Sequence, residues 1–194
     1  MAPSTRAALV VLAGSALANF ALPADKDKPE RKPDVRFVAT PEEVVAKMLE
    51  VAKITAKDVV YDLGCGDGRI VCAAARKHKC KAFGFDIDSE RIKDSEANKA
   101  KLPAEVRKLV TFKRQDIFKL DLSGATVVML YLRPQLNVKL IPQLKKLKAG
   151  SRIVSHSWDM KGVTPDEGFP IKVKKKDGYQ RDVYRWTTPL KLED

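Results

Sequence analysis

The chain has 194 residues, of which 44% are hydrophobic and 32% are charged. These values suit one soluble globular domain with a sizeable core, and they exclude a fibrous or wholly disordered chain. The net charge of +12 is compatible with a solvated basic surface, a nucleic-acid or acidic partner, or an anionic membrane face. We favour the solvated surface because the lysines are spread through the chain, although they gather at residues 145–148 and 172–176.

Residues 1–24 have the pattern of a secretory signal peptide. Arg6 is their only charged side chain, an apolar run follows at residues 7–18, and small residues offer cleavage sites after Ala18 or Ala24. The run is short for a membrane-spanning helix, which needs ~20 apolar residues. The pattern indicates export or association with the cell envelope, which would allow contact with a membrane. A mitochondrial presequence is the alternative.

The cysteines indicate a different compartment. Their number is odd and their spacing matches no metal site, so we expect neither a disulfide framework nor a bound metal. The three residues are Cys65, Cys72 and Cys80. Free thiols fit a reducing environment, so the location stays open between the envelope, the cytoplasm and the mitochondrion.

The domain is predicted to begin after a linker. Residues 25–36 are charged and contain prolines, which predicts a flexible connection to a monomeric domain at residues 37–194. A helix is predicted to follow, with Thr40 as its N-cap, Pro41 in its first turn and Glu43 closing a capping box. Its apolar residues recur at helical spacing, so we expect it to pack across a sheet and cover a ligand site.

The most informative stretch is residues 58–70. A short apolar strand is followed by a glycine turn and then by helix-forming residues, which is the opening unit of a nucleotide-binding α/β sheet. The turn is spaced G-x-G-x-G, with Gly64, Gly66 and Gly68, and Asp62 precedes it. The dinucleotide fingerprint is G-x-G-x-x-G. A carboxylate at the strand end is a poor neighbour for phosphates and a good one for an ammonium group.

A second strand, at residues 81–86, also ends in a carboxylate. Asp86 lies 18 residues after Gly68, close to the ~20 residues expected for an acid that binds a ribose. Later apolar segments predict further strands at residues 109–112, 125–132 and 151–155. Because parallel strands present their carboxyl ends at one edge, we expect the following residues there: Asp116, Ile117, Tyr131, Arg133, His156, Trp158 and Asp159.

The C-terminal part has a hairpin pattern. Alternating residues at 171–174 and 182–186 flank the pair Asp177-Gly178, which predicts two antiparallel strands. An amphipathic helix is expected before them at residues 135–147, ended by Gly150.

Residues 62–68 resemble motif I of the class I methyltransferases that use S-adenosylmethionine (SAM). The resemblance implies an α/β fold with a Rossmann-like, doubly wound, seven-stranded sheet and an antiparallel C-terminal hairpin. It implies SAM as the cofactor, with the methionine end held by Asp62 and the loop residues Gly64, Cys65, Gly66 and Gly68. It further implies that Asp86, with Ile87 beside it, binds the ribose, and that Asp116 reaches the adenine amino group while Ile117 covers the ring. A helix or loop cap is the alternative role for Asp116.

Three further segments, residues 37–41, 130–137 and 155–160, are similar to a group of small bacterial methyltransferases. That group is related to mitochondrial protein-lysine methyltransferases acting on the ADP/ATP carrier and the ATP synthase c subunit. The resemblance implies methyl transfer to a protein lysine. The alternatives are an RNA or small-molecule methyltransferase and a SAM-binding module without turnover. The Asn/Asp-Pro-Pro-Tyr motif of many amino- and base-methylating enzymes is absent, which puts adenine-N6 methylation of DNA in doubt.

Three residues are candidates for catalysis. A lysine amine must lose its proton before it attacks the methyl group, and a dry pocket favours the neutral amine. Tyr131 would shape the channel, and His156 or Asp159 would orient the amine or take its proton. His156 could instead be a satisfied histidine at a strand end, and Trp158 could be either a packing residue or a wall of the substrate site.

Overall fold

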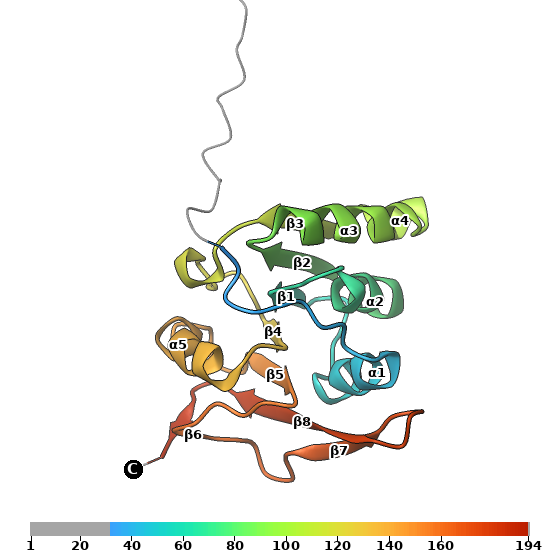
Figure 1. Ribbon diagram of the computed structural model, residues 1–194. Coiled ribbons are helices and arrows are strands. Elements are labelled where there is room, and N and C mark those ends of the chain that lie inside the picture. Colours follow the sequence, from blue (N-terminus) through green and yellow to red (C-terminus); the bar gives the residue numbers. More distant parts are fainter. Residues whose placement is uncertain (1–31, 194) are drawn as a thin grey trace, which may run out of the picture.

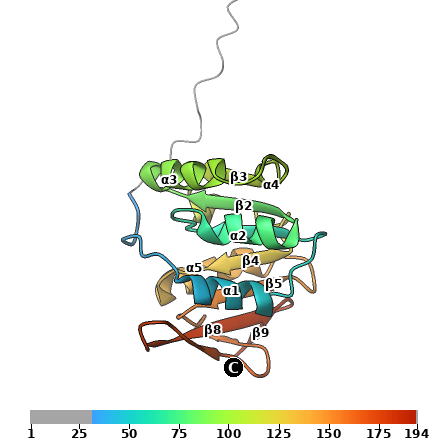
Figure 2. The same ribbon diagram turned by 90° about the vertical axis from the view of Figure 1, so that its right-hand side faces the viewer.

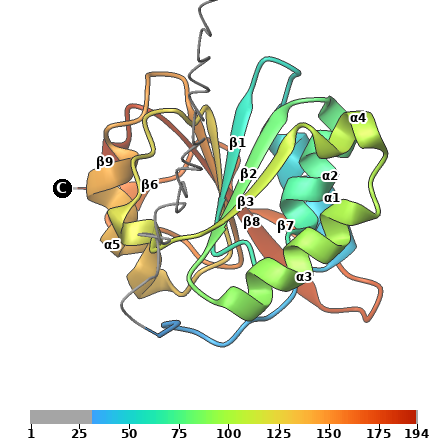
Figure 3. The same cartoon turned by 90° about the horizontal axis from the view of Figure 1, so that it is seen from above.

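The computed structural model describes residues 32–193 as a three-layer α/β domain. The predicted signal peptide and most of the predicted linker lie outside the described residues. Four helices cover one face of the central sheet: α1 (Glu42–Val51), α2 (Arg69–His78), α3 (Ser89–Ala100) and α4 (Ala104–Arg107). The other face is covered by α5 (Pro134–Leu144) and the short 3₁₀ helix η1 (Ile117–Lys119) (Figures 1 and 3). Within residues 32–193, no helix is long and apolar enough to cross a membrane.

The central sheet has seven strands in the order β3-β2-β1-β4-β5-β8-β7. The parallel strands are β1 (Val59–Leu63), β2 (Lys81–Asp86), β3 (Val110–Arg114), β4 (Val127–Leu130) and β5 (Arg152–His156). The antiparallel hairpin is formed by β7 (Ile171–Lys174) and β8 (Gln180–Thr187), and β8 runs antiparallel to β5. A second sheet pairs β6 (Val163–Thr164) with β9 (Lys191–Leu192). The predicted sheet and C-terminal hairpin are confirmed.

Burial on both faces of the sheet explains its apolar strands. All four residues of β4 are buried, as expected for a central parallel strand. The core on one side joins the sheet to α1 and α2, and the core on the other side joins it to α5. Trp186 of β8 is 1% exposed, and its indole N–H donates to the carbonyl of Val163 at 3.0 Å.

The strand order places a ligand crevice at one edge of the sheet. β1 pairs with β2 on one side and β4 on the other, so the order of connection reverses there, and such switch points bind ligands at the carboxyl ends of the strands. Figure 2 shows the arrowheads of β2 and β4 pointing to this edge, with the segment before α1 running past it.

Two helix ends differ from those predicted from the local sequence. The predicted capping box is wrong, because α1 begins at Glu42 and its N-cap, Pro41, makes no side-chain cap. The Thr40 hydroxyl lies instead 3.3 Å from His156 Nδ1. The predicted stop at Gly150 is also wrong, because α5 ends at Leu144 and a separate turn connects it to β5.

A partly buried ion pair fixes the opposite edge of the sheet. Asp58 accepts hydrogen bonds from Thr55, Thr126 and Arg152, the last at 2.8 Å. Burial alone would raise the pKa of Asp58, but these hydrogen bonds lower it to about 2. Since the unfolded chain binds this proton near pH 3.8, the carboxylate stabilises the fold above that pH, and this contribution is lost as pH falls toward 2.

Asp58→Asn is therefore expected to lower the free energy of unfolding at pH 7 by about 2 kcal/mol. The difference between mutant and wild type should shrink as pH falls from about 4 to about 2. Urea denaturation at several pH values measures it. An equal difference at pH 7 and pH 3 would contradict the assignment.

Candidate functional site

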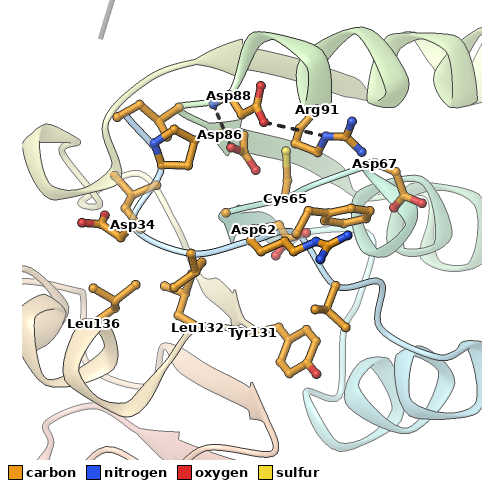
Figure 4. Close-up of a pocket in the computed structure, with 18 of the residues that line it drawn as sticks. Asp34, Asp62, Cys65, Asp67, Asp86, Asp88, Arg91, Tyr131, Leu132 and Leu136 are labelled. Atoms are coloured by element: carbon orange, nitrogen blue, oxygen red, sulfur yellow. Dashed lines mark hydrogen bonds and ion pairs between the residues drawn. The ribbon is translucent and has the colours of Figure 1, made fainter. Parts of the chain in front are cut away.

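A pocket with an empty volume of about 860 Å³ opens at the carboxyl ends of β1, β2 and β4. It is lined by the glycine loop, by the ends of these strands and by the segment at residues 33–38. Figure 4 shows the segment of Asp34 crossing the pocket, with Asp86 and Tyr131 toward opposite ends in that view. The lining includes five carboxylates, Asp34, Asp62, Asp67, Asp86 and Asp88, and three arginines, Arg36, Arg69 and Arg91, so carboxylates outnumber cations around the pocket.

Asp62 is the most unusual of these carboxylates. Its side chain is buried at the end of β1, and Oδ2 has no hydrogen-bond partner among the described residues. Burial, together with the nearby Asp86 and Asp67, raises the pKa of Asp62 to about 8. Burying a carboxyl group without a hydrogen-bond partner costs free energy, unless a bound ligand supplies that partner. Its position in the pocket would let a cationic ligand group supply the missing partner.

The glycine loop approaches its neighbours too closely for side chains. Gly64, Gly66 and Gly68 all have positive φ, at 76°, 54° and 75°. A Cβ atom on Gly66 would lie 2.2 Å from the Phe37 ring, and one on Gly68 would lie 2.4 Å from the Phe112 ring. The loop is thus packed on both sides while its backbone faces the pocket.

Gly66→Ala is expected to displace Phe37 from the loop and destabilise the protein by about 1–3 kcal/mol, because it adds a clash at a positive φ. Thermal denaturation measures the loss. Gly162→Ala is a matched control, since Gly162 has φ 85° and open space around its Cβ position. A Gly66→Ala effect no larger than that of the control would contradict the packing account.

Asp86 joins the glycine loop to the start of α3. Its Oδ2 accepts from the Gly66 N–H at 2.9 Å, and its Oδ1 accepts from the Asp88 N–H at 3.0 Å. Burial raises the pKa of Asp86, although these backbone hydrogen bonds oppose the shift. Ile87 lies beside it in the pocket wall. The structure therefore brings the predicted ribose acid and the glycine loop together.

The predicted adenine residues lie at η1. Asp116 Oδ1 accepts from the Phe118 N–H at 3.0 Å, which caps η1. Asp116 is buried and does not line the pocket, whereas Ile117 does. The cap foreseen as the alternative role of Asp116 is present, and its contact with adenine stays a prediction.

The cysteines are buried and free. Cys65 lines the pocket, and burial raises the pKa of its thiol well above the usual value. Burial also raises the pKa values of Cys72 and Cys80. These thiols are protonated at neutral pH and are poor nucleophiles. Across residues 32–193, no group of three or more His, Cys, Asp or Glu could hold a metal ion.

Tyr131 and His156 form a stacked pair at the other end of the pocket. Tyr131 lines the pocket, and its ring centroid lies 3.8 Å from that of His156. His156 is fully buried, and burial lowers its pKa to about 4. Its Nδ1 contacts the Thr40 hydroxyl, while its Nε2 has no partner within the described chain. His156 thus has one hydroxyl contact and one stacked ring, and its role, catalytic or structural at the end of β5, stays a prediction.

The remaining candidates follow β5 on an exposed turn. Trp158 is 44% exposed, and its role, as a packing residue or as a wall of the substrate site, stays a prediction. Asp159 is also exposed, and neither residue lines the pocket. The structure thus separates Tyr131, at the pocket wall, from His156 behind it and from Asp159 on the adjacent turn.

The sequence prediction missed the segment that covers the pocket. We expected α1 to cover the site, but α1 packs in the core and residues 33–38 line the pocket instead. Arg69 holds this segment by donating to the Thr40 carbonyl at 2.9 Å, and Arg91 lies over the Phe37 ring. The exposed apolar pair Phe37-Val38 before the helix was the available signal.

Comparison with known proteins places the chain in a family. The sequence model of the ANTKMT methyltransferase domain matches residues 62–167. A protein-lysine N-methyltransferase from Saccharolobus islandicus is 43% identical over 142 residues, which are 72% of this chain and 87% of that protein.

Solved structures agree with this placement. An RNA methyltransferase from Salinibacter ruber, in complex with S-adenosylhomocysteine, is 44% identical and has a TM-score of 0.70, covering 81% of this chain and 97% of that one. A ribosomal protein L11 methylase from Lactobacillus delbrueckii, 16% identical, has a TM-score of 0.58 over 74% of this chain and 77% of its own, and shows the fold alone. The predicted fold and the predicted cofactor, SAM, are confirmed. The chain belongs to the ANTKMT methyltransferase domain family and is a class I SAM-dependent methyltransferase.

Proposed function

We propose that this enzyme methylates lysine side chains of proteins. The observation that carries the proposal is the 43% identity to a protein-lysine N-methyltransferase over 87% of that protein. The aromatic residues beside the pocket support the proposal, because an aromatic ring suits a cationic amine better than a phosphate backbone.

The pocket residues would hold SAM in a defined order. Asp62 would pair with its ammonium group, and the glycine loop of Gly64, Cys65, Gly66 and Gly68 would approach the methionine part. Asp86 and Ile87 would bind the ribose, and Ile117 would cover the adenine, with Asp116 reaching its amino group. Bound there, SAM supplies a methyl group already activated by a sulfonium centre.

The protein then has to align a neutral amine with that methyl group, which is mainly a matter of position. Tyr131 would form the wall of the channel. His156 would support the Tyr131 ring rather than take a proton, because an imidazole whose pKa is about 4 is a weak base at neutral pH. Asp159, the exposed carboxylate on the turn that follows His156, would orient the ammonium group, and the proton that this group loses would pass to water.

RNA methylation is the second candidate. It is favoured by the 44% identity to an RNA methyltransferase and by the net charge of +12, because lysines that neutralise phosphates strengthen nucleic-acid binding. The basic residues of β7 and the following turn, within 172–176, would provide such contacts.

Methyl-labelled SAM and a cell lysate separate the candidates. We expect label that survives nuclease, disappears with protease and appears as methyl-lysine after acid hydrolysis of the protein. Asp62→Asn is the control and should transfer less label when SAM is limiting, because it binds SAM more weakly. Label that is released only by nuclease would overturn the proposal in favour of RNA. The absence of transfer to any fraction, despite SAM binding, would leave a binding module without turnover.

A further inference from the structure

The turn that follows β5 has an unusual backbone. Ser157 has a φ of 63°, and the Trp158 N–H donates to the His156 carbonyl at 2.8 Å. An i→i+2 hydrogen bond around a positive φ is the rare, strained form of the γ-turn. Such strain in a non-glycine residue persists only where the surrounding structure enforces it, and it is concentrated at functional sites.

Three elements enforce this turn. The amide nitrogen of Asn137, a fully buried residue of α5, lies 3.0 Å from the Asp159 carbonyl and 3.3 Å from the Trp158 carbonyl. The Ser155 hydroxyl donates to the Trp158 carbonyl at 2.6 Å, and the Ser157 N–H donates to the Asp182 carbonyl of β8 at 2.7 Å. These hydrogen bonds all fix the backbone of the turn.

The turn held in this way exposes the indole of Trp158. Trp158 is 44% exposed, whereas the other tryptophan of the chain, Trp186, is 1% exposed. Exposing a large aromatic side chain from a strained, rigid turn does not serve core packing. It is the usual arrangement of an aromatic that meets a partner, since a rigid ring gives contact area at little entropic cost.

The turn adjoins the pocket in two ways. Leu136 lines the pocket, and its neighbour Asn137 holds the turn. Tyr131 also lines the pocket and stacks on His156, whose carbonyl accepts the hydrogen bond that closes the turn. Figure 4 shows Leu136 and Tyr131 on the side of the pocket away from Asp86. The turn therefore adjoins the side of the pocket that Leu136 and Tyr131 form.

We propose that residues 156–159 form the recognition element for the methyl-accepting lysine, with Trp158 as its contact residue and Asn137 as its positioning residue. The proposal rests on the proposed function. The indole face would take the four-carbon stem of the lysine and attract its ammonium group through a cation–π contact. The adjacent carboxylate of Asp159 would favour the same cation.

The test uses labelled SAM, the full-length enzyme and the nuclease-treated protein fraction of a lysate as the acceptor. Trp158→Ala should raise the apparent KM for that fraction by at least about tenfold, and Trp158→Phe, which keeps a ring, by less than about threefold. The Kd for SAM, measured by calorimetry, should stay within about twofold for both variants. Leu192→Ala is the control, because Leu192 is an apolar residue that is 51% exposed in β9, which follows the end of β8 that pairs with the start of β5.

Asn137 is tested through its dependence on Trp158. Asn137→Ala should raise the apparent KM in the wild-type background but change it by less than about twofold when Trp158 is already alanine. A residue that only stabilised the fold would have the same effect in both backgrounds. Such additivity would overturn the positioning role even if Asn137→Ala is poorly stable.

The outcomes separate the two proposals. An unchanged KM in Trp158→Ala, or an equal rise in Leu192→Ala, would overturn the recognition element while methyl-lysine formation leaves the proposed function in place. Wild-type enzyme that labels RNA and no protein would overturn the proposed function itself, and this inference with it.

Discussion

Asp62→Asn is expected to weaken SAM binding by at least about 30-fold, or ~2 kcal/mol, without destabilising the SAM-free protein at pH 8. The carboxyl group is buried at the end of β1 with Oδ2 unpaired, so the bound ammonium group would complete it. The amide keeps the size of the side chain but removes the charge. The mutation should therefore lower the affinity for SAM without lowering the free energy of unfolding, whereas an ordinary core mutation lowers both.

The pH dependence of stability tests the same group. The folded protein keeps the Asp62 proton up to about pH 8, whereas the unfolded chain releases it near pH 3.8. Between these values the folded state binds more protons, so this residue makes the free energy of unfolding decrease as pH rises. In Asp62→Asn that contribution is absent. The mutant should gain stability relative to the wild type as pH rises across this interval.

Calorimetry with SAM and urea denaturation between pH 4 and pH 8 provide both measurements, at about unit steps of pH. Asp121→Asn is a control, because Asp121 is an exposed carboxylate whose hydrogen bonds stay within its own loop. Unchanged SAM affinity in a folded Asp62→Asn protein would contradict the role of this carboxylate. A parallel pH dependence of mutant and wild type would contradict its burial as an unpaired acid.

Asp86→Ala is expected to weaken SAM binding at least tenfold, about 1.4 kcal/mol, because charge-assisted hydrogen bonds to the ribose are lost. The mutation also removes the acceptor of the Gly66 N–H and of the Asp88 N–H. We therefore expect a simultaneous loss of stability of about 1–3 kcal/mol, the usual effect of leaving such groups unpaired.

Asp86→Asn separates the two effects. The amide can still accept one of the two backbone hydrogen bonds, so it should recover part of the stability while SAM binding stays weak. Thermal denaturation and calorimetry on the same samples measure both. Full SAM affinity in either folded variant would show that the ribose is bound by another group.

The sheet was predictable because its signals are local. The run of apolar residues in β4, the glycines between β1 and α2, and the Asp177-Gly178 pair each specify their element within a few residues. The same holds for Asp62 and Asp86, which terminate adjacent strands and therefore meet at one edge. The cofactor end of the pocket could thus be inferred before any contact was known.

Contacts between distant residues could not be inferred in this way. The local sequence predicts Thr40 as a helix cap, but in the structure its hydroxyl contacts His156, which is 116 residues away. The segment at residues 33–38 covers the pocket in place of α1 because Phe37 packs on Gly66 and Arg91. The exposure of Trp158 depends on a buried amide of α5 and on a strained turn. None of these pairings has a sequence pattern of its own.

A crystal structure with S-adenosylhomocysteine tests the central claim most directly. The account expects the ammonium group against Asp62, the ribose hydroxyls against Asp86, and the sulfur facing Tyr131. A ligand bound in the pocket with its ammonium group away from Asp62, or a ligand bound outside the pocket, would contradict the account.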